Sequence, residues 1–240
     1  MTTAASDFRV MTSGAFTAAH LQLIPQLERI TQKKVVTVTT SVGTGETSIP
    51  NRLKRGEIVD IVIVADALLA QLIEEGLVMR DTRTSLARSS IALAVRAGAP
   101  KPDAGSAEAL KRTLLAAKSI AYSASVSGQF VTTELYQRLG IADECLPKSR
   151  LITGGERTGA VVARGEADIA FQQMSELLPV PGIAHITPLP PELQKVALFS
   201  AGVAATSSDP ALAREAIRFL ASPEAEAAIA KTGLEPLRDS

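Results

Sequence analysis

The sequence predicts an α/β protein of two lobes, in which each lobe is a largely parallel sheet flanked by helices. Two observations carry this prediction. Short apolar or β-branched runs alternate with segments of helical periodicity along most of the 240 residues, which is typical of parallel strands joined by helices. Apolar residues make up 46% of the chain. That content is enough for one large domain or for two lobes of about 100 to 120 residues each.

Glycines at helix ends and the periodicity of apolar residues indicate the strands and helices of the first lobe. Apolar residues at alternating four- and three-residue spacing define one face of the first helix, and Pro25 inside this helix is expected to bend its axis. Gly56 and Gly76 each follow a short helical segment and are expected to end it. The expected strands are 8–11, 35–39 and 58–66, and the expected helices are 16–31, 48–55 and 67–75.

The alternation of strands and helices resumes after a Gly/Pro-rich stretch near residue 100. The proline-rich segment 180–194 is expected to be a loop. Ser222 followed by Pro223 is a strong helix start, because a hydroxyl can cap the helix and Pro fits its first position. The expected strands are 91–95, 120–122, 151–153, 168–172 and 196–204, and the expected helices are 107–118, 129–139, 158–165, 210–221 and 223–231.

Two long apolar strands, 91–95 and 196–204, are expected to cross between the lobes. The first lobe then comprises residues 1–88 and 200–240, and the second comprises residues 89–199. Two crossing strands make a hinge, and the cleft beside a hinge is a common place for a small ligand. We therefore expect a ligand cleft between the lobes.

The charge balance argues against several classes of partner. Lys plus Arg and Asp plus Glu each total 25, so there is no overall positive field to hold nucleic acid or a membrane surface. The single cysteine, Cys145, cannot form an internal disulfide. His20 and His185 are far apart in the sequence, with no further ligands at metal-binding spacing. We expect neither a metal nor a cofactor.

The expected location depends on a leader sequence. Residues 1–10 lack the basic start and apolar run of a secretory signal, and no stretch approaches the roughly 20 apolar residues of a membrane span. We expect a cytoplasmic protein if the chain is used as given, and a periplasmic one if a leader has been removed. An ABC permease is an expected partner only in the second case.

Small hydroxyl residues and glycines recur where strands are followed by helices. At such a junction, unpaired backbone N–H groups and the helix dipole favour an anion. Glycine admits close approach of a ligand, and a hydroxyl can donate to an oxygen atom. One junction alone is more often ordinary capping. Three together predict an anion-binding site made of Ser13, Gly14, Ser41, Thr44, Gly45, Ser123, Ser125, Ser127 and Gly128.

Arg157 and Gln172 are further candidates. Arg157 lies just before a helix and can pair bidentately with a carboxylate, although it can nearly as well bridge Glu156 or solvent. Gln172 lies at the end of a strand, with Gln173 beside it. The segment GTGE is not followed by the Gly-Lys-Ser/Thr of a phosphate-binding loop, which argues against a nucleotide site.

Four segments resemble one known family: MTSGAFTAA, SIPNRLKRGEIVDIVIVAD, LLAAKSIAYSASVSG and GAVVARGEADIAFQQ. With the Gly-Glu-x-x-Asp entry to a strand, they are similar to the molybdate-binding-like branch of the type 2 periplasmic solute-binding proteins. The resemblance covers essentially the whole chain. It implies two α/β lobes around a hinge and an oxyanion or carboxylate held by hydroxyls and backbone N–H groups. The ligand contacts that it implies are Ser13, Thr44 and Ser125 to Ser127.

Two functions are compatible with this resemblance. Glu46 and Arg157 near the expected ligand suit an organic acid better than a tetrahedral metal oxyanion. Within the branch, the chain resembles the aconitate isomerases, which interconvert trans- and cis-aconitate. This likeness implies a cofactor-free isomerase of a small unsaturated carboxylate. The alternative is a solute-binding protein that captures molybdate, or another small oxyanion or carboxylate, for an ABC transporter.

Moving a double bond requires a base that removes an allylic proton and donors that stabilise the resulting anion. The candidate bases are Glu46, Glu156 and His20. A polyanionic substrate would raise the pKa of either glutamate, whereas a nearby helix start would lower it. His20 lies on the apolar face of the first helix and is more often a packed histidine than a catalyst.

Overall fold

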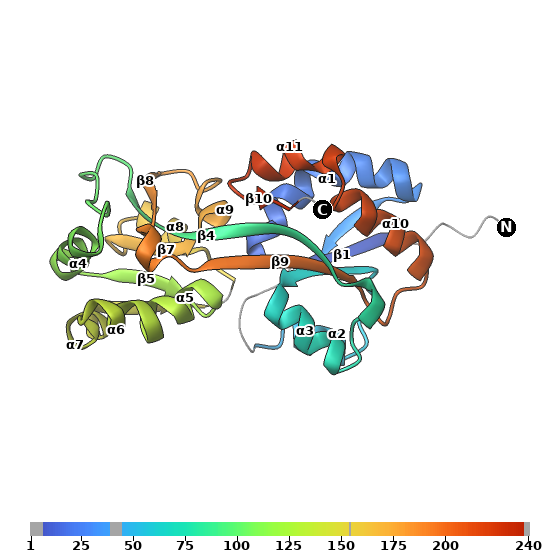
Figure 1. Ribbon diagram of the computed structural model, residues 1–240, viewed down its shortest axis with the longest axis horizontal. Coiled ribbons are helices and arrows are strands. Elements are labelled where there is room, and N and C mark those ends of the chain that lie inside the picture. The colour runs from blue at the N-terminus through green and yellow to red at the C-terminus, as the bar shows by residue number, and fades with distance from the viewer. Residues whose placement is uncertain (1–6, 39–44, 154, 238–240) are drawn as a thin grey trace. The chain divides into compact units, whose positions relative to one another are not determined.

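The computed structural model describes residues 7–38, 45–153 and 155–237 of the chain (Figure 1). The chain divides into two compact units. Unit 1 comprises Met1–Arg88 and Leu198–Ser240, and unit 2 comprises Ser89–Ala197. The strands β4 (Thr84–Arg96) and β9 (Val196–Val203) contribute residues to both units. Each unit has an α/β architecture with helices on both faces of its sheet.

Three parallel strands form the centre of unit 1: β1 (Phe8–Thr12), β2 (Val35–Val38) and β3 (Ile61–Ala65). β1 lies between the other two, with Phe8 opposite Val35 and Val10 opposite Ile61. β9 is the antiparallel neighbour of β3. These strands consist almost entirely of apolar and β-branched residues because both faces of the sheet are covered.

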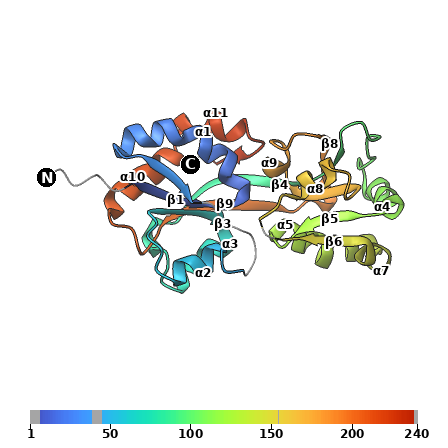
Figure 2. The same ribbon diagram turned by 180° about the vertical axis from the view of Figure 1, so that it is seen from behind.

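Helices cover the two faces of the unit 1 sheet (Figure 2). Val62 and Val64 of β3 share a buried cluster with Leu69 and Leu72 of α3, while α1 packs with α10 and α11 on the other face. Asp209 begins α10 by accepting a hydrogen bond from the backbone N–H of Leu212. The helices are α1 (Gly14–Thr31), α2 (Ile49–Lys54), α3 (Asp66–Glu74), α10 (Pro210–Leu220) and α11 (Pro223–Ala230).

The sheet of unit 2 also has a parallel centre, made of β5 (Ile120–Ser123), β6 (Ser149–Ile152) and β7 (Ile169–Gln173). β5 pairs in parallel with both β6 and β7. β4 is antiparallel to β7, and β8 (Ile183–Pro188) is antiparallel to β4. The carboxyl ends of β5, β6 and β7 therefore lie at one edge of the unit 2 sheet.

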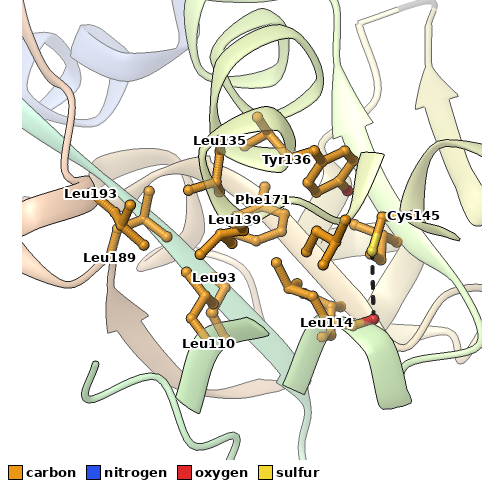
Figure 3. Packing of buried hydrophobic residues seen from close by; sticks show 14 of the residues in the cluster. Leu93, Leu110, Leu114, Leu135, Tyr136, Leu139, Cys145, Phe171, Leu189 and Leu193 are labelled. Atoms are coloured by element: carbon orange, nitrogen blue, oxygen red, sulfur yellow. Dashed lines mark hydrogen bonds between the residues drawn. The ribbon is translucent and has the colours of Figure 1, made fainter. Parts of the chain in front are cut away.

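Alternate residues of β7 pack on opposite faces of this sheet. Ile169 and Phe171 belong to a buried cluster with Leu110 and Tyr136 (Figure 3), whereas Ala170 belongs to a second cluster on the α8 face. Burial of a large apolar side chain contributes about 2 kcal/mol, so these clusters hold the helices to the sheet. The helices are α4 (Ala107–Ala116), α5 (Val126–Phe130), α6 (Tyr136–Leu139), α7 (Ala142–Cys145), α8 (Thr158–Ala163) and α9 (Met174–Leu177).

The structure corrects the prediction of a loop over 180–194, because this segment contains β8. Ile183 and Ile186 pack against the second cluster of unit 2, which favours a strand over a solvated loop. Pro188 is the last residue of β8, which pairs with β4 at the edge of the sheet, where proline is tolerated. The helix expected at 129–139 begins earlier, at Val126, and includes a π-helical turn, Val131–Leu135.

Candidate functional site

Three serine hydroxyls form a continuous chain at the carboxyl end of β5. Ser123 Oγ lies 2.8 Å from Ser125 Oγ, which lies 2.9 Å from Ser127 Oγ. Three hydroxyls carry three protons, and the two bonds use two of them, so one O–H is left to donate elsewhere. Ser125 is the N-cap residue of α5, yet its side chain makes no capping hydrogen bond. The three serines predicted for this junction are thus brought together, and Ser125 is not used as an ordinary cap.

Gly128 lets β5 and α5 approach each other closely. A Cβ atom on this residue would lie 1.7 Å from the backbone oxygen of Ser123, a separation that real atoms do not reach. The predicted glycine is therefore required by the backbone path that brings the serines together. Gly45, by contrast, is exposed, and a Cβ atom placed on it would meet no atom within 4 Å among the described residues beyond its chain neighbours.

Arg157 is the N-cap residue of α8 and is half-buried. Within the described part of the chain, its guanidinium makes no ion pair or hydrogen bond. The alternative in which Arg157 bridges Glu156 is not observed, because Glu156 pairs with Arg164 at 2.7 Å. A half-buried guanidinium that makes no ion pair or hydrogen bond with the described residues is able to bind a carboxylate in its bidentate geometry.

Gln172 is a residue of β7, and its side chain is hydrogen-bonded to Thr158 at the start of α8 and to Glu176. Its Oε1 atom accepts hydrogen bonds from the backbone N–H and from the hydroxyl of Thr158, at 3.1 and 2.7 Å. Its Nε2 atom donates to Glu176 Oε1 at 2.9 Å. Gln172 thus caps the start of α8 and orients a buried carboxyl group.

Glu176 is the buried carboxyl that sequence reasoning missed. It is 5% exposed, and burial raises its pKa to about 7, although the charge of Arg157 and hydrogen bonds from Gln172 and the backbone of Gln173 act in the opposite direction. At neutral pH this group is close to half protonated. The signal in the sequence is one acidic residue in the otherwise uncharged stretch AFQQMSELLPV, one helical turn beyond a strand end.

Gln173 and Ser175 are two further polar side chains at this sheet edge. Both are almost fully buried, and neither Gln173 Oε1 nor Ser175 Oγ has a hydrogen-bond partner among the described residues. Burying such a group without a partner costs free energy. Gln173 is therefore better placed than Gln172 to accept a hydrogen bond from a ligand. Period-two alternation along β7 could have distinguished these neighbours.

In unit 1, Ser13 is the N-cap residue of α1, and Gly14 is the first residue of that helix. The Ser13 Oγ atom is buried and has no hydrogen-bond partner among the described residues, whereas its backbone N–H donates to Ile63 O at 2.9 Å. The backbone is thus fixed while the hydroxyl is left unsatisfied. Such an arrangement suits a donor reserved for a ligand.

Ser41 and Thr44 lie outside the described residues. Glu46 follows in an exposed turn, where its backbone oxygen accepts from Arg55 at 2.7 Å, and its carboxylate makes no ion pair or hydrogen bond with any described residue. Glu156 is exposed and paired with Arg164. Counting contacts among the described residues alone, Glu46 is the one of the two predicted glutamate bases whose carboxylate is not paired.

His20 is fully buried against β2, and its Nε2 lies 3.0 Å from Thr37 Oγ1. Burial lowers its pKa to about 4, so the imidazole is neutral at physiological pH. A buried neutral histidine bonded to a strand residue matches the packing role weighed from the sequence.

A hollow of about 490 Å³ lies elsewhere in unit 2, between β4, α4 and the amino end of β7. Arg96, Lys101 and Asp168 are among its lining residues, and none of the predicted ligand residues is. Over the residues that the structure describes, no group of three or more His, Cys, Asp or Glu side chains could hold a metal ion. No helix in the same set is long and apolar enough to cross a membrane.

The fold is an α/β fold of two units, and serines lie at strand–helix junctions of both units. The structure is similar to the periplasmic molybdate-binding protein of Azotobacter vinelandii, with a TM-score of 0.75 and 18% identity over 98% of this chain and 100% of that one. It is also similar to Peb3 from Campylobacter jejuni, with a TM-score of 0.69 and 16% identity over 98% and 100% of the two chains.

The chain belongs to the bacterial extracellular solute-binding protein family, whose model matches residues 8–235. Among curated proteins, it is 40% identical to an aconitate isomerase of a Pseudomonas species over 229 residues, which are 95% of this chain and 87% of that protein. The family resemblance and the fold class expected from the sequence are thereby confirmed.

Proposed function

We propose that this protein is a cofactor-free isomerase of a small unsaturated polycarboxylate, with trans-aconitate and cis-aconitate as its substrate and product. The observation that carries the proposal is the Arg157 guanidinium, which makes no hydrogen bond or ion pair with the described residues, in the same unit as the linked hydroxyls of Ser123, Ser125 and Ser127. A tricarboxylate offers acceptors to both kinds of donor. The 40% identity to an aconitate isomerase supports this choice of substrate.

The reaction moves one double bond and leaves the composition unchanged. A base removes a proton from the CH₂ carbon next to the double bond, the electron pair spreads over the allylic system and its carboxylate, and a proton returns to the far carbon. Hydroxyl and guanidinium donors lower the barrier because negative charge grows on the carboxylate oxygens in the transition state.

Glu46 is the base that we favour among the three candidates. Its carboxylate makes no ion pair or hydrogen bond with the residues that the structure describes, whereas Glu156 is paired with Arg164 and His20 is buried against Thr37. The ligand donors that we propose in unit 1 are Ser13 Oγ and the start of α1. Those in unit 2 are Arg157 and the three serines.

The direct test is incubation of the protein with pure trans-aconitate, with proton NMR to follow the appearance of cis-aconitate. Conversion in ²H₂O should incorporate deuterium, because the abstracted proton exchanges with solvent. An Arg157→Gln variant should convert far more slowly, whereas Arg150→Gln, which removes an exposed arginine of the same unit, should match the wild type. No conversion by folded wild-type protein would remove the isomerase proposal.

The second candidate is a solute-binding protein that delivers molybdate or another small oxyanion or carboxylate to an ABC transporter. The family and the structural likeness to a molybdate-binding protein favour it. Calorimetric titration with molybdate, and separately with trans-aconitate, distinguishes the two. Tight binding of either anion without turnover supports capture, and turnover supports the isomerase.

A further inference from the structure

A buried chain of side chains connects Glu176 to the start of α8. Thr158, Gln172 and Glu176 are 0%, 2% and 5% exposed. Because the backbone N–H of Thr158 can only donate, the amide oxygen of Gln172 must face it, and the amide nitrogen must then face Glu176. The orientation of every group in this chain is therefore fixed by the hydrogen bonds themselves.

Arg157 directly precedes Thr158, to which Gln172 links Glu176, and the charge of Arg157 acts on Glu176. The helix α9, which carries Glu176, packs against β7 and β8. β7 has no titratable side chain, β8 has only the exposed His185, and α8 has none between Thr158 and Ala163. Arg164 pairs with both Glu156 and Glu166, Arg150 lies near Glu166, and all four side chains are exposed. Arg157 is thus the charge that an anionic ligand would neutralise.

We propose that Glu176 is a positioning residue that holds the start of α8 through Gln172 and Thr158, and that takes up a proton when a carboxylate ligand binds at Arg157. This inference rests on the proposed function for its ligand. Because proton uptake by Glu176 accompanies ligand binding, the affinity for a polycarboxylate falls as the pH rises.

The sign of the coupling follows from the charges. Without ligand, the guanidinium of Arg157 stabilises the ionised form of Glu176 and lowers its pKa, against the effect of burial. A bound carboxylate neutralises that guanidinium and adds negative charge, so the ionised form of Glu176 becomes less favourable. Protonation then accompanies binding, and by linkage the affinity is higher at pH values where Glu176 is already protonated.

The first experiment uses ligand-free protein. Carbon NMR of ¹³C-labelled glutamate carboxyls follows the titration of Glu176, whose signal is assigned by its absence in Glu176→Gln. Arg157→Gln should raise the midpoint by about half a pH unit or more, because a stabilising positive charge is removed. Arg150→Gln, at an exposed arginine, should leave the midpoint unchanged. An unchanged midpoint in Arg157→Gln would overturn the inference, whatever the ligand.

The second experiment is calorimetric titration of the wild type with an equilibrium mixture of aconitate isomers, in two buffers of different ionisation enthalpy. At pH 7.5 the wild type should take up about half a proton on binding, and its affinity should fall about fivefold between pH 7 and pH 9. Glu176→Gln, which keeps an acceptor for Gln172, should bind without uptake and with a flat pH profile. Glu166→Gln should behave like the wild type.

The two kinds of failure are separable. If the wild-type protein binds aconitate without taking up a proton, the inference is contradicted. This result needs no variant, so the test remains valid even if Glu176→Gln does not fold. Absence of any aconitate binding, together with the expected midpoint shift in ligand-free Arg157→Gln, counts against the proposed substrate. The charge coupling between Arg157 and Glu176 would then remain supported, and molybdate would be the next anion to test as a ligand.

Discussion

A Cβ atom on Gly128 would lie 1.7 Å from the backbone oxygen of Ser123 and 2.8 Å from its carbonyl carbon. The obstructing atoms belong to the backbone, so the neighbour cannot rotate away. Gly128→Ala should lower the free energy of unfolding by about 3 kcal/mol or shift the serine loop. Gly105→Ala is the matched control, since its Cβ would meet only Asp103 Oδ1 at 3.9 Å. Denaturant unfolding curves measure the stability of both variants. Equal free energies of unfolding would contradict the close approach of Gly128 to the backbone of Ser123.

Ser13→Ala should weaken ligand binding without lowering the stability of the protein. Because Ser13 Oγ is buried without a partner among the described residues, its removal should leave the free energy of unfolding equal or raise it by up to about 1 kcal/mol. Affinity for aconitate should fall about tenfold if the hydroxyl donates to the ligand. Thermal melts and calorimetry provide the two measurements. A destabilised variant with unchanged affinity would show a structural role instead.

Ser125→Ala removes the central member of the hydroxyl chain and leaves Ser123 and Ser127 without their shared partner. We expect about tenfold weaker binding of aconitate and a loss of about 1 kcal/mol in the free energy of unfolding. Ser106→Ala is the control, because Ser106 caps α4 through the Ala109 N–H and should lose similar stability without losing affinity. Equal affinities of the two variants for aconitate would show that the hydroxyls of Ser123, Ser125 and Ser127 are not part of the binding site.

Arg157→Lys keeps the charge but loses the planar guanidinium. A bidentate contact with a carboxylate would then be reduced to a point charge, and KM for trans-aconitate should rise about thirtyfold, equivalent to about 2 kcal/mol. Steady-state kinetics of isomerisation measure this change. Stability should change little, because the Arg157 side chain makes no ion pair or hydrogen bond within the described residues. An unchanged KM would show that Arg157 does not contact the substrate.

The pKa of His20, lowered to about 4 by burial, predicts a pH dependence of stability. The unfolded chain binds a proton near pH 6.5 while the folded chain does not, so the free energy of unfolding falls as the pH decreases between these values. Between pH 7 and pH 5 this group should remove about 2 kcal/mol. His20→Gln should lack this component, and the difference between the two pH profiles isolates it. Parallel profiles would mean that His20 titrates normally.

Local patterns allowed much of the fold to be predicted. Apolar runs marked β1, β3 and β7, and the Ser222-Pro223 pair marked the start of α11 at Pro223. The prediction of a loop over 180–194 was wrong. It was based on the prolines of this segment, whereas two isoleucines of the same segment pack on the sheet. Whether such a segment forms a strand depends on a partner strand, here β4, which is far away in the sequence.

The candidate site divides in the same way. The sequence by itself determined the hydroxyls and glycines of the junctions, because strand ends and helix starts are local, and it determined the family. Only the tertiary structure decided that Gln172 is bonded to Thr158 and Glu176, that Glu156 pairs with Arg164, and that Glu176 is buried. Hydrogen-bond partners and desolvation depend on which residues distant in the chain meet in space, and pKa values depend on both.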